Sequence, residues 1–412
     1  MKRYLSRLAA RLTANRHRLP RWVTRRIDSA IANPNSLAGR LGYAMLGSAA
    51  SPTATEPPVL SAPTRLYIGP ANYAGQGRRW AHAVQSNRPE TEAVNMSVAV
   101  PGSVLQFESD IVVPLRTYMG DDGWQAAHFD YVTGFTHVLF ESGRPLFGER
   151  FGPSAFDEAP LVAAKGPIVG MVCHGSDARL PSRHAAAHRW SPFHDRALAT
   201  PAAERRVAEF LQRLEAFDGP SFVTTPDLLD DVPEGVWCPV VVDVDRWSGG
   251  PVPLQRERPV VVHSPSHSGV KGSELIEPAV RLLEMEGLIT YRRVEDIAPD
   301  AVPEVYRSAD IVLDQFRLGS YGVAACEAMA AGRVVLGHVT NDVRDRVREE
   351  TDAELPIVEA TPDTIADVLR SVIADREAAR ATAEASSAFA RDVHDGRRSA
   401  HTLSTNLLSL RR

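Results

Sequence analysis

The chain has 412 residues, 44% of them hydrophobic, and a formal net charge of -5 at pH 7. This length is sufficient for two domains with buried cores plus extensions. No apolar run reaches the roughly 18 residues of a transmembrane helix, and the start lacks the apolar core of a secretory signal. The three cysteines are odd in number and widely spaced, which favours neither disulfides nor a zinc site. We expect a cytoplasmic protein without a metal or a nucleic-acid partner.

The first 50 residues are predicted to form a basic helical arm. Within residues 1–45, Lys2 and nine arginines stand against one acid, Asp28, which gives this stretch +9 and leaves -14 for the remainder. Helical spacing puts apolar and basic residues on different faces. The apolar face comprises Leu5, Leu8 and Leu12, and the basic face Arg3, Arg7 and Arg11.

Such an amphipathic helix suits an anionic membrane surface, so residues 1–32 are candidates for peripheral binding to the inner face of the membrane. The alternatives are packing on the protein's own body or on a partner, or an organellar transit peptide. Residues 51–64, SPTATEPPVLSAPT, have the composition of a linker.

From Arg65 onward, short apolar runs alternate with helical stretches, which is typical of buried parallel strands in an α/β fold. After the Gly/Pro-containing connector 240–253 the alternation restarts. We therefore predict two Rossmann-like domains, 65–245 and 246–390, and a helical tail at 391–412. Ligands of such folds bind at the carboxyl ends of the strands and in the cleft between paired domains.

Two loop-to-helix segments of the second predicted domain carry candidate ligand-binding side chains. The stretch HSPSHSGVKGSELI (263–276) contains Lys271, one of three lysines in the chain, just before a helix start. A compact ammonium beside a helix N-terminus suits a phosphate. In YGVAACEAMAA (321–331), Glu327 is the only carboxylate among core residues, and a buried carboxylate needs a partner. The alternatives are a solvated loop cation and a glutamate that caps a loop or pairs with an arginine.

The segment 309–339 resembles the donor-binding signature of retaining, family-4-like glycosyltransferases (glycosyltransferase group 1) of the GT-B fold. The matching residues are Gly322, Glu327, Ala328, Met329, Ala330, Gly332, Val334 and Val335. Three more segments resemble parts of this family and occur in the family's order along the chain. Residues 172–179, VCHGSDAR, resemble the strand and histidine loop that face the donor. Residues 237–247, WCPVVVDVDRW, resemble the interdomain crossing, and residues 261–272, VVHSPSHSGVKG, resemble the phosphate loop. The resemblance covers residues 65–390 and implies an acceptor domain followed by a donor domain.

The resemblance implies that Glu327 binds the ribose hydroxyls of a nucleotide-sugar and that Lys271 contacts its diphosphate. The residue types suit this chemistry, because a carboxylate accepts two hydroxyl hydrogen bonds, and a lysine with helix-start amides neutralises a leaving diphosphate. The loop that enters the helix, with Ser320, Tyr321 and Gly322, is expected to line the donor.

Two positions depart from the family pattern. Gly319 stands where the family carries a first glutamate, eight residues before the second, so the usual contact with the donor sugar is missing. Asp314 and Gln315, at the end of their strand, are candidates to replace it. The arginine that often precedes the phosphate lysine is also missing, and His267 or Arg317 is a candidate to compensate.

Candidates in the first predicted domain follow two of its strands. The resemblance places His174 against the transferred sugar, while Asp177 could be the general base of an inverting transfer. The alternative to these functional roles is a structural one, in which His174 is an ordinary loop residue and Asp177 caps a helix N-terminus. Arg179 is a candidate to contact the acceptor or a phosphate. The loop GPANYAGQGRRW (69–80) lacks the dinucleotide fingerprint and is either a donor or acceptor contact or a simple turn. Its candidate residues are Asn72, Gly75 and Gln76.

Taken together, these features predict a glycosyltransferase that moves a hexosyl group from a nucleoside diphosphate sugar to a hydroxyl of a glycan or lipid-linked acceptor. Retention of configuration follows from the resemblance alone, and no cofactor is expected. The alternatives are a sugar-nucleotide epimerase on the same fold, or a non-catalytic sugar-nucleotide-binding subunit, which Gly319 makes credible. The nucleotide base, the sugar, the acceptor and the oligomeric state stay open.

Overall fold

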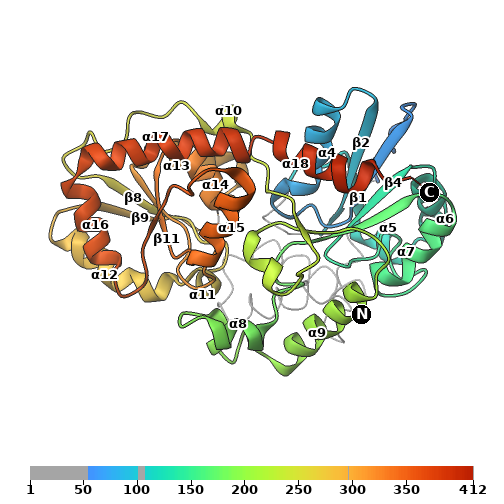
Figure 1. The fold of residues 1–412 in the computed structure, drawn as a ribbon, viewed down its shortest axis with the longest axis horizontal. Coiled ribbons are helices and arrows are strands. Elements are labelled where there is room, and N and C mark those ends of the chain that lie inside the picture. The colour runs from blue at the N-terminus through green and yellow to red at the C-terminus, as the bar shows by residue number, and fades with distance from the viewer. Residues whose placement is uncertain (1–53, 101–106, 296, 412) are drawn as a thin grey trace, which may run out of the picture. The chain divides into compact units, whose positions relative to one another are not determined.

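A computed structural model describes residues 54–100, 107–295 and 297–411. The predicted arm, including the candidate membrane-binding residues 1–32, lies outside these ranges. Within them, no helix is both long enough and apolar enough to cross a membrane. The described chain forms two compact units, residues 54–78 with 92–169 and residues 79–91 with 170–411, and it contains two β-sheets (Figure 1). The domain boundary at 245/246 stays a prediction.

The larger sheet has seven strands in the order β3-β2-β1-β4-β5-β6-β7. The pairs β1–β4, β2–β3, β5–β6 and β6–β7 are parallel, as predicted for an α/β fold. Its strands are β1 (Thr64–Gly69), β2 (Thr91–Ala99), β3 (Ile111–Pro114), β4 (His137–Glu141), β5 (Ile168–Cys173), β6 (Ser221–Val223) and β7 (Val236–Trp237).

The helical segments along this part of the chain begin at clear local signals. Ser154 caps α7 in a reciprocal capping box with Asp157, and Thr200 caps α9 by accepting from the Ala203 amide. The segments are η2 (Tyr73–Gly75), α4 (Gln76–Asn87), α5 (Leu115–Gly120), α6 (Asp122–Thr133), α7 (Ala155–Ala164), α8 (Pro181–Ala187), η3 (Pro192–His194), α9 (Pro201–Glu215), η4 (Pro226–Asp230) and α10 (Val244–Trp247).

The smaller sheet has five strands in the order β12-β11-β10-β8-β9, and every neighbouring pair is parallel. Its strands are β8 (Val260–His263), β9 (Thr290–Arg293), β10 (Ile311–Leu313), β11 (Val334–Gly337) and β12 (Ile357–Glu359). The helical segments of this region are α11 (Ser268–Lys271), α12 (Ser273–Met285), η5 (Pro299–Ala301), α13 (Val302–Ser308), α14 (Val323–Ala330), α15 (Asn341–Thr351), α16 (Ile365–Ala374), α17 (Arg376–Val393), α18 (Arg397–Leu403) and η6 (Ser404–Leu408).

The smaller sheet is covered on both faces, which explains its continuous apolar strands. Alternate strand residues such as Val261, Leu313 and Leu336 join the side chains of α12 and α16 in one core, while α14 and β11 pack against α17 (Figure 1). As predicted, α14 is almost wholly apolar and buried. It is followed by Gly332 at φ +67°, a left-handed conformation that suits glycine at a helix end.

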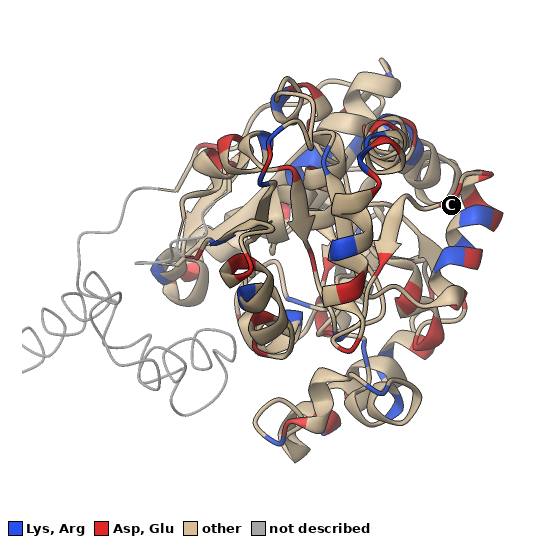
Figure 2. Ribbon diagram, turned by 90° about the vertical axis from the view of Figure 1, so that its left-hand side faces the viewer, with Lys and Arg blue, Asp and Glu red and all other residues tan. Residues whose placement is uncertain are grey.

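Charged residues of both signs are interspersed over the surface helices (Figure 2). Examples are the ion pairs of Arg281 with Glu284 and of Arg370 with Glu286. Exposed pairs of this kind contribute little to stability.

Candidate functional site

The predicted donor-binding residues lie where β8 and β10 of the smaller sheet end. His267 and Lys271 follow β8, and the loop from Asp314 to Gly322 follows β10 and leads into α14. A backbone hydrogen bond of 2.9 Å from the Phe316 amide to the Lys271 carbonyl joins the two loops. Parallel strands bring their carboxyl ends to one edge of a sheet, so residues distant in sequence meet there.

Lys271 forms an ion pair with Asp314, with 2.6 Å between the ammonium Nζ and the carboxylate Oδ1. The Lys271 side chain is 15% exposed and that of Asp314 only 2%. Asp314 was predicted as a possible sugar contact, but in this structure its carboxylate holds the lysine. An ammonium group has three N–H donors, so Lys271 keeps donors for an anionic ligand.

Glu327 lies on α14 with its side chain 15% exposed, and its Oε1 is 3.7 Å from Nη1 of Arg79. Burial raises the pKa of Glu327 to about 7, although the positive charges of Arg79, Arg246 and Lys271 oppose this rise. A carboxyl group with a pKa shifted by burial next to cations is typical of functional sites.

Arg79 is a residue that the sequence did not single out. It lies on α4, and its Nη1 also donates to the Val241 carbonyl at 3.0 Å. Its neighbour Arg78 instead pairs with Asp110 and Glu108. The only feature of the sequence that could have pointed to Arg79 is the pair of arginines, Arg78 and Arg79, directly after the glycine-bearing loop. Nothing in the local sequence shows which of the two pairs with Glu327.

Gln315 shapes the loop after β10. Its amide nitrogen donates to the Ser320 carbonyl, and its Oε1 accepts from the Leu318 amide at 3.3 Å. Gly319 has φ +68°, which a side chain would strain. In the part of the chain that the structure describes, no residue accepts a hydrogen bond from the amides of residues 319–322. These N–H groups, at the start of α14, suit an anion.

Of the remaining predicted donor residues, Ser320 and Tyr321 are buried and His267 has a local role. The Tyr321 hydroxyl lies 3.4 Å from Nε2 of His394, so this side chain packs inward. His267 caps the short helix α11 by accepting from the Val270 amide at 3.3 Å. Arg317 donates to the carbonyls of Trp190, Ser191 and Gly269. It therefore ties the two loops to the segment after α8.

His174 and Asp177 both follow β5, but their side chains have different surroundings. The Asp177 carboxylate accepts from the backbone amides of His174, Gly175 and Ala178, at 2.6 to 3.1 Å. This pattern braces the loop. The His174 ring lies against Trp80 of α4, with ring centroids 5.5 Å apart.

Arg179 is buried in an ion pair with Asp227, donating from Nε at 3.0 Å and also from Nη2. Burial raises the pKa of Asp227, but the charge of Arg179 and the hydroxyls of Ser320 and Thr225 outweigh it, so the net pKa is lowered. The aspartate is thus ionised and engaged by the arginine.

The loop with Asn72, Gly75 and Gln76 belongs largely to the first unit. The buried Glu141 carboxylate accepts from the amides of Ala71 and Asn72, at 2.8 and 2.9 Å. The Asn72 side chain donates to the Glu108 carbonyl and the Ser109 hydroxyl. Asn72 and Gln76 are both buried, and the chain's own carboxylate thus holds the amides at the start of this loop.

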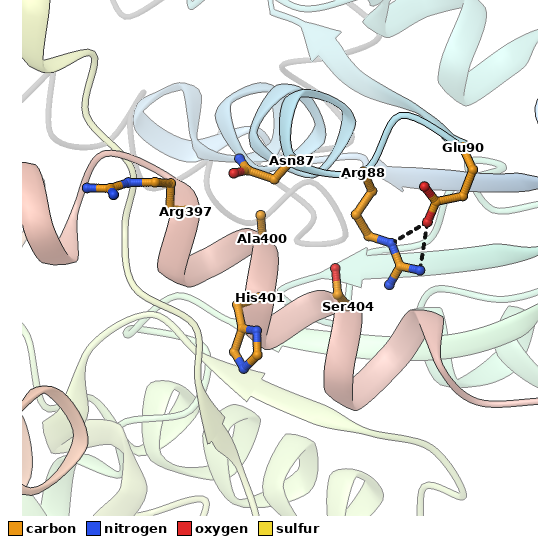
Figure 3. A pocket seen from close by; sticks show the side chains of 7 residues that line it. All are labelled: Asn87, Arg88, Glu90, Arg397, Ala400, His401 and Ser404. Carbon is orange, nitrogen blue, oxygen red and sulfur yellow. Dashed lines mark hydrogen bonds and ion pairs between the residues drawn. The ribbon is translucent and has the colours of Figure 1, made fainter.

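An open hollow of about 520 Å³ lies between the end of α4 and the helices α18 and η6 (Figure 3). Its charged groups are already paired: Arg88 bonds Glu90 at 2.8 Å, and Arg397 bonds Asp395 at 2.5 Å. None of the predicted site residues lines it. Among the described residues, no cluster of three or more His, Cys, Asp or Glu side chains could hold a metal ion.

Comparisons with known proteins address the family and the fold. The glycosyl transferase-like family matches residues 255–405, the range that contains Lys271, the loop after β10 and Glu327. No curated protein sequence matches the chain.

Several solved structures are similar to it. HepE of Anabaena, crystallised with UDP and glucose, is 14% identical, with 84% of this chain and 100% of that chain covered and a TM-score of 0.55. A glycosyltransferase of Rickettsia africae is 11% identical, with 84% and 98% covered and a TM-score of 0.52. WaaG, a glycosyltransferase involved in lipopolysaccharide biosynthesis, is 12% identical, with 83% and 99% covered and a TM-score of 0.50. At these identities the likeness shows the GT-B fold, which confirms the predicted fold class. The comparisons thus show a chain with the GT-B fold whose residues 255–405 match the glycosyl transferase-like family.

Proposed function

We propose that this protein transfers a hexosyl group from a nucleoside diphosphate sugar to a hydroxyl of a glycan or lipid-linked acceptor, with retention of configuration. The observation that carries the proposal is the grouping of Lys271, Glu327 and the amides of residues 319–322 at one edge of the smaller sheet. This grouping lies in the range that the glycosyl transferase-like family matches.

Each group has a chemical task in this reaction. The Glu327 carboxylate accepts hydrogen bonds from the two ribose hydroxyls, and Lys271 with the loop amides binds the diphosphate. When the bond from the anomeric carbon to the phosphate oxygen breaks, its electron pair leaves with the diphosphate. The acceptor oxygen forms the new bond to the anomeric carbon, and the proton of the acceptor hydroxyl passes to the departing diphosphate. The ammonium and the amides then stabilise the increased negative charge. Asp314 positions the ammonium through its ion pair.

The state of Asp177 favours retention over inversion. An inverting transfer needs a base that takes the proton of the acceptor hydroxyl. The Asp177 carboxylate accepts from three backbone amides, with three bonds to Oδ1 and one to Oδ2, so we assign it the task of bracing the loop rather than that of a base. His174, at the end of β5, is proposed to contact the transferred sugar.

The donor nucleotide and the cellular location are proposed from similar structures and from the composition of residues 1–32. Crystals of HepE contain UDP, UDP with glucose, or UDP-glucose, so UDP-sugars are the first donors to test. The composition of residues 1–32 is the basis for proposing that the enzyme works at an anionic membrane in the cytoplasm, where a lipid-linked acceptor would be presented.

Binding assays with matched variants test the site. Wild-type protein is titrated with UDP, GDP and ADP, and then Lys271→Ala and Glu327→Ala are compared with controls at the exposed Lys165 and Glu349. Loss of one charge-assisted hydrogen bond should weaken nucleotide binding about tenfold to a hundredfold. The controls should bind as wild type does.

Two further measurements separate the alternatives. Because Lys271→Ala leaves the buried charge of Asp314 unpaired, the double variant Lys271→Met, Asp314→Asn distinguishes lost binding from lost folding. A product assay then asks whether sugar moves to an acceptor or to water. Unchanged nucleotide affinity in both single variants would overturn the site. Normal binding without transfer or hydrolysis would favour the non-catalytic subunit.

A further inference from the structure

His188 occupies the space next to the position where the family pattern has its first glutamate. A Cβ atom added to Gly319 would lie 2.8 Å from Cγ2 of Thr340 and 3.1 Å from Nδ1 of His188. The Gly319 carbonyl also accepts from the Thr340 amide at 2.9 Å, and its φ of +68° disfavours any side chain. The imidazole of His188 is therefore the polar group that faces this position.

The ring of His188 is held in place from one side. It stacks on the His184 ring, with centroids 4.2 Å apart and 26° between the planes. His184 in turn bonds the Ser191 hydroxyl at 2.7 Å and the Leu318 carbonyl at 3.2 Å, so the end of α8 is tied to the Gly319 loop. Among the described residues, neither ring nitrogen of His188 has a hydrogen-bond partner.

A hollow of about 290 Å³ with both polar and apolar surface borders His188. Its wall consists of Arg179, Arg183, His184, Ala187, His188, Asp227, Asp230 and Asp231. The charges there are compensated within the protein, since Asp227 pairs with Arg179, Asp231 with Arg183 and Asp230 with Arg346. A wall that offers polar and apolar surface, with its charges compensated, suits a neutral ligand such as a sugar better than an anion or a cation.

His188 itself has the donor and acceptor character that a hydroxyl requires. Burial lowers its pKa, and the charge of Asp227 only partly offsets this effect. The imidazole is therefore neutral near pH 7, with one nitrogen that donates and one that accepts.

We propose that His188 is a specificity-determining residue that hydrogen-bonds a hydroxyl of the transferred sugar, beside the position where Gly319 offers no side chain. This inference rests on the proposed donor function of the same region. His188 then discriminates between sugars, while Lys271 and Glu327 hold the nucleotide.

The test compares sugar nucleotide with plain nucleotide, so that sugar and nucleotide contacts are measured separately. Isothermal titration gives the affinities of wild type and His188→Ala for UDP and for UDP-glucose, UDP-galactose and UDP-N-acetylglucosamine. If GDP is the nucleotide that binds, GDP and GDP-mannose replace them. For the best sugar, His188→Ala should lower the ratio of sugar-nucleotide to nucleotide affinity about fivefold, the effect of one neutral hydrogen bond. Affinity for the plain nucleotide should not change, which also reports that the variant is folded.

Two more variants sharpen the result. His188→Gln keeps an amide donor and acceptor and should recover part of the ratio, whereas His188→Phe keeps the ring without polar atoms and should not. His401→Ala, at an exposed histidine of α18, is the control and should match wild type. A ratio that is the same in wild type and His188→Ala overturns the role of His188 and leaves the proposed function standing. If no nucleoside diphosphate binds the wild type, both proposals are wrong.

Discussion

The proposed contact of Glu327 with the donor ribose should make donor binding sensitive to pH near neutrality. Its pKa is about 7 in the free protein, and the carboxylate form is the better acceptor for ribose hydroxyls. About one tenth of the molecules carry the carboxylate at pH 6 and about nine tenths at pH 8. Because the apparent affinity scales with the competent fraction, it should rise about tenfold between these pH values.

The assay is isothermal titration of UDP-glucose, or of the corresponding sugar nucleotide if another base binds, from pH 6 to pH 8. A sugar nucleotide is preferred to UDP because its diphosphate lacks the terminal phosphate group whose second pKa is near 6. Glu327→Gln keeps the shape of the side chain but does not titrate. It should bind more weakly than wild type at pH 8 and show no rise with pH, while Glu349→Gln should behave as wild type.

A specific outcome would refute this reasoning. If Glu327→Gln shows the same tenfold rise as wild type, the titrating group is a residue other than Glu327. If wild-type affinity is constant over the range, then Glu327 does not contact the ribose in its ionised form.

Four further predictions follow from the same structure. The pKa of Glu327 is raised in the folded state, from 4.5 to about 7, so its stabilising contribution is complete below pH 4.5 and lost as pH rises through 7. Denaturant unfolding should show wild type losing about 3 kcal/mol relative to Glu327→Gln from pH 4 to 8; a constant difference would contradict this. Asp177→Asn keeps an oxygen acceptor for the loop amides and should retain transfer, and a loss of 100-fold or more, on the order expected for a general base, would assign it that role. Gly319→Ala should cost about 1–3 kcal/mol of unfolding free energy because of its positive φ and its approach to Thr340, and unchanged stability would show that the loop relaxes. The chain of residues 1–412 should bind anionic vesicles more tightly than neutral ones in a salt-sensitive way, and deletion of residues 1–32 should abolish the difference; equal binding to both lipids would exclude the membrane role.

Local patterns in the sequence were sufficient to predict the strands and the helix that surround the proposed donor site. The apolar runs before Lys271 and Asp314 predicted two buried parallel strands, now seen as β8 and β10. The alanine-rich stretch around Glu327, ended by Gly332, predicted the buried helix α14. These predictions succeed because strand burial, helix periodicity and a helix-ending glycine depend on neighbouring residues alone.

The contacts of the site depended on the order and register of the strands, which no local pattern encodes. Only the folded chain shows that Arg79, from the first helix of the described chain, reaches Glu327, or that Asp314 engages the ammonium of Lys271. In the same way His188 meets the Gly319 loop because α8 packs against it. Residues far apart in sequence become neighbours when parallel strands align their carboxyl ends, and burial then sets the pKa of groups such as Glu327. The sequence supplies the residue types at this edge of the sheet, and tertiary packing decides which of them meet and how strongly their pKa values shift.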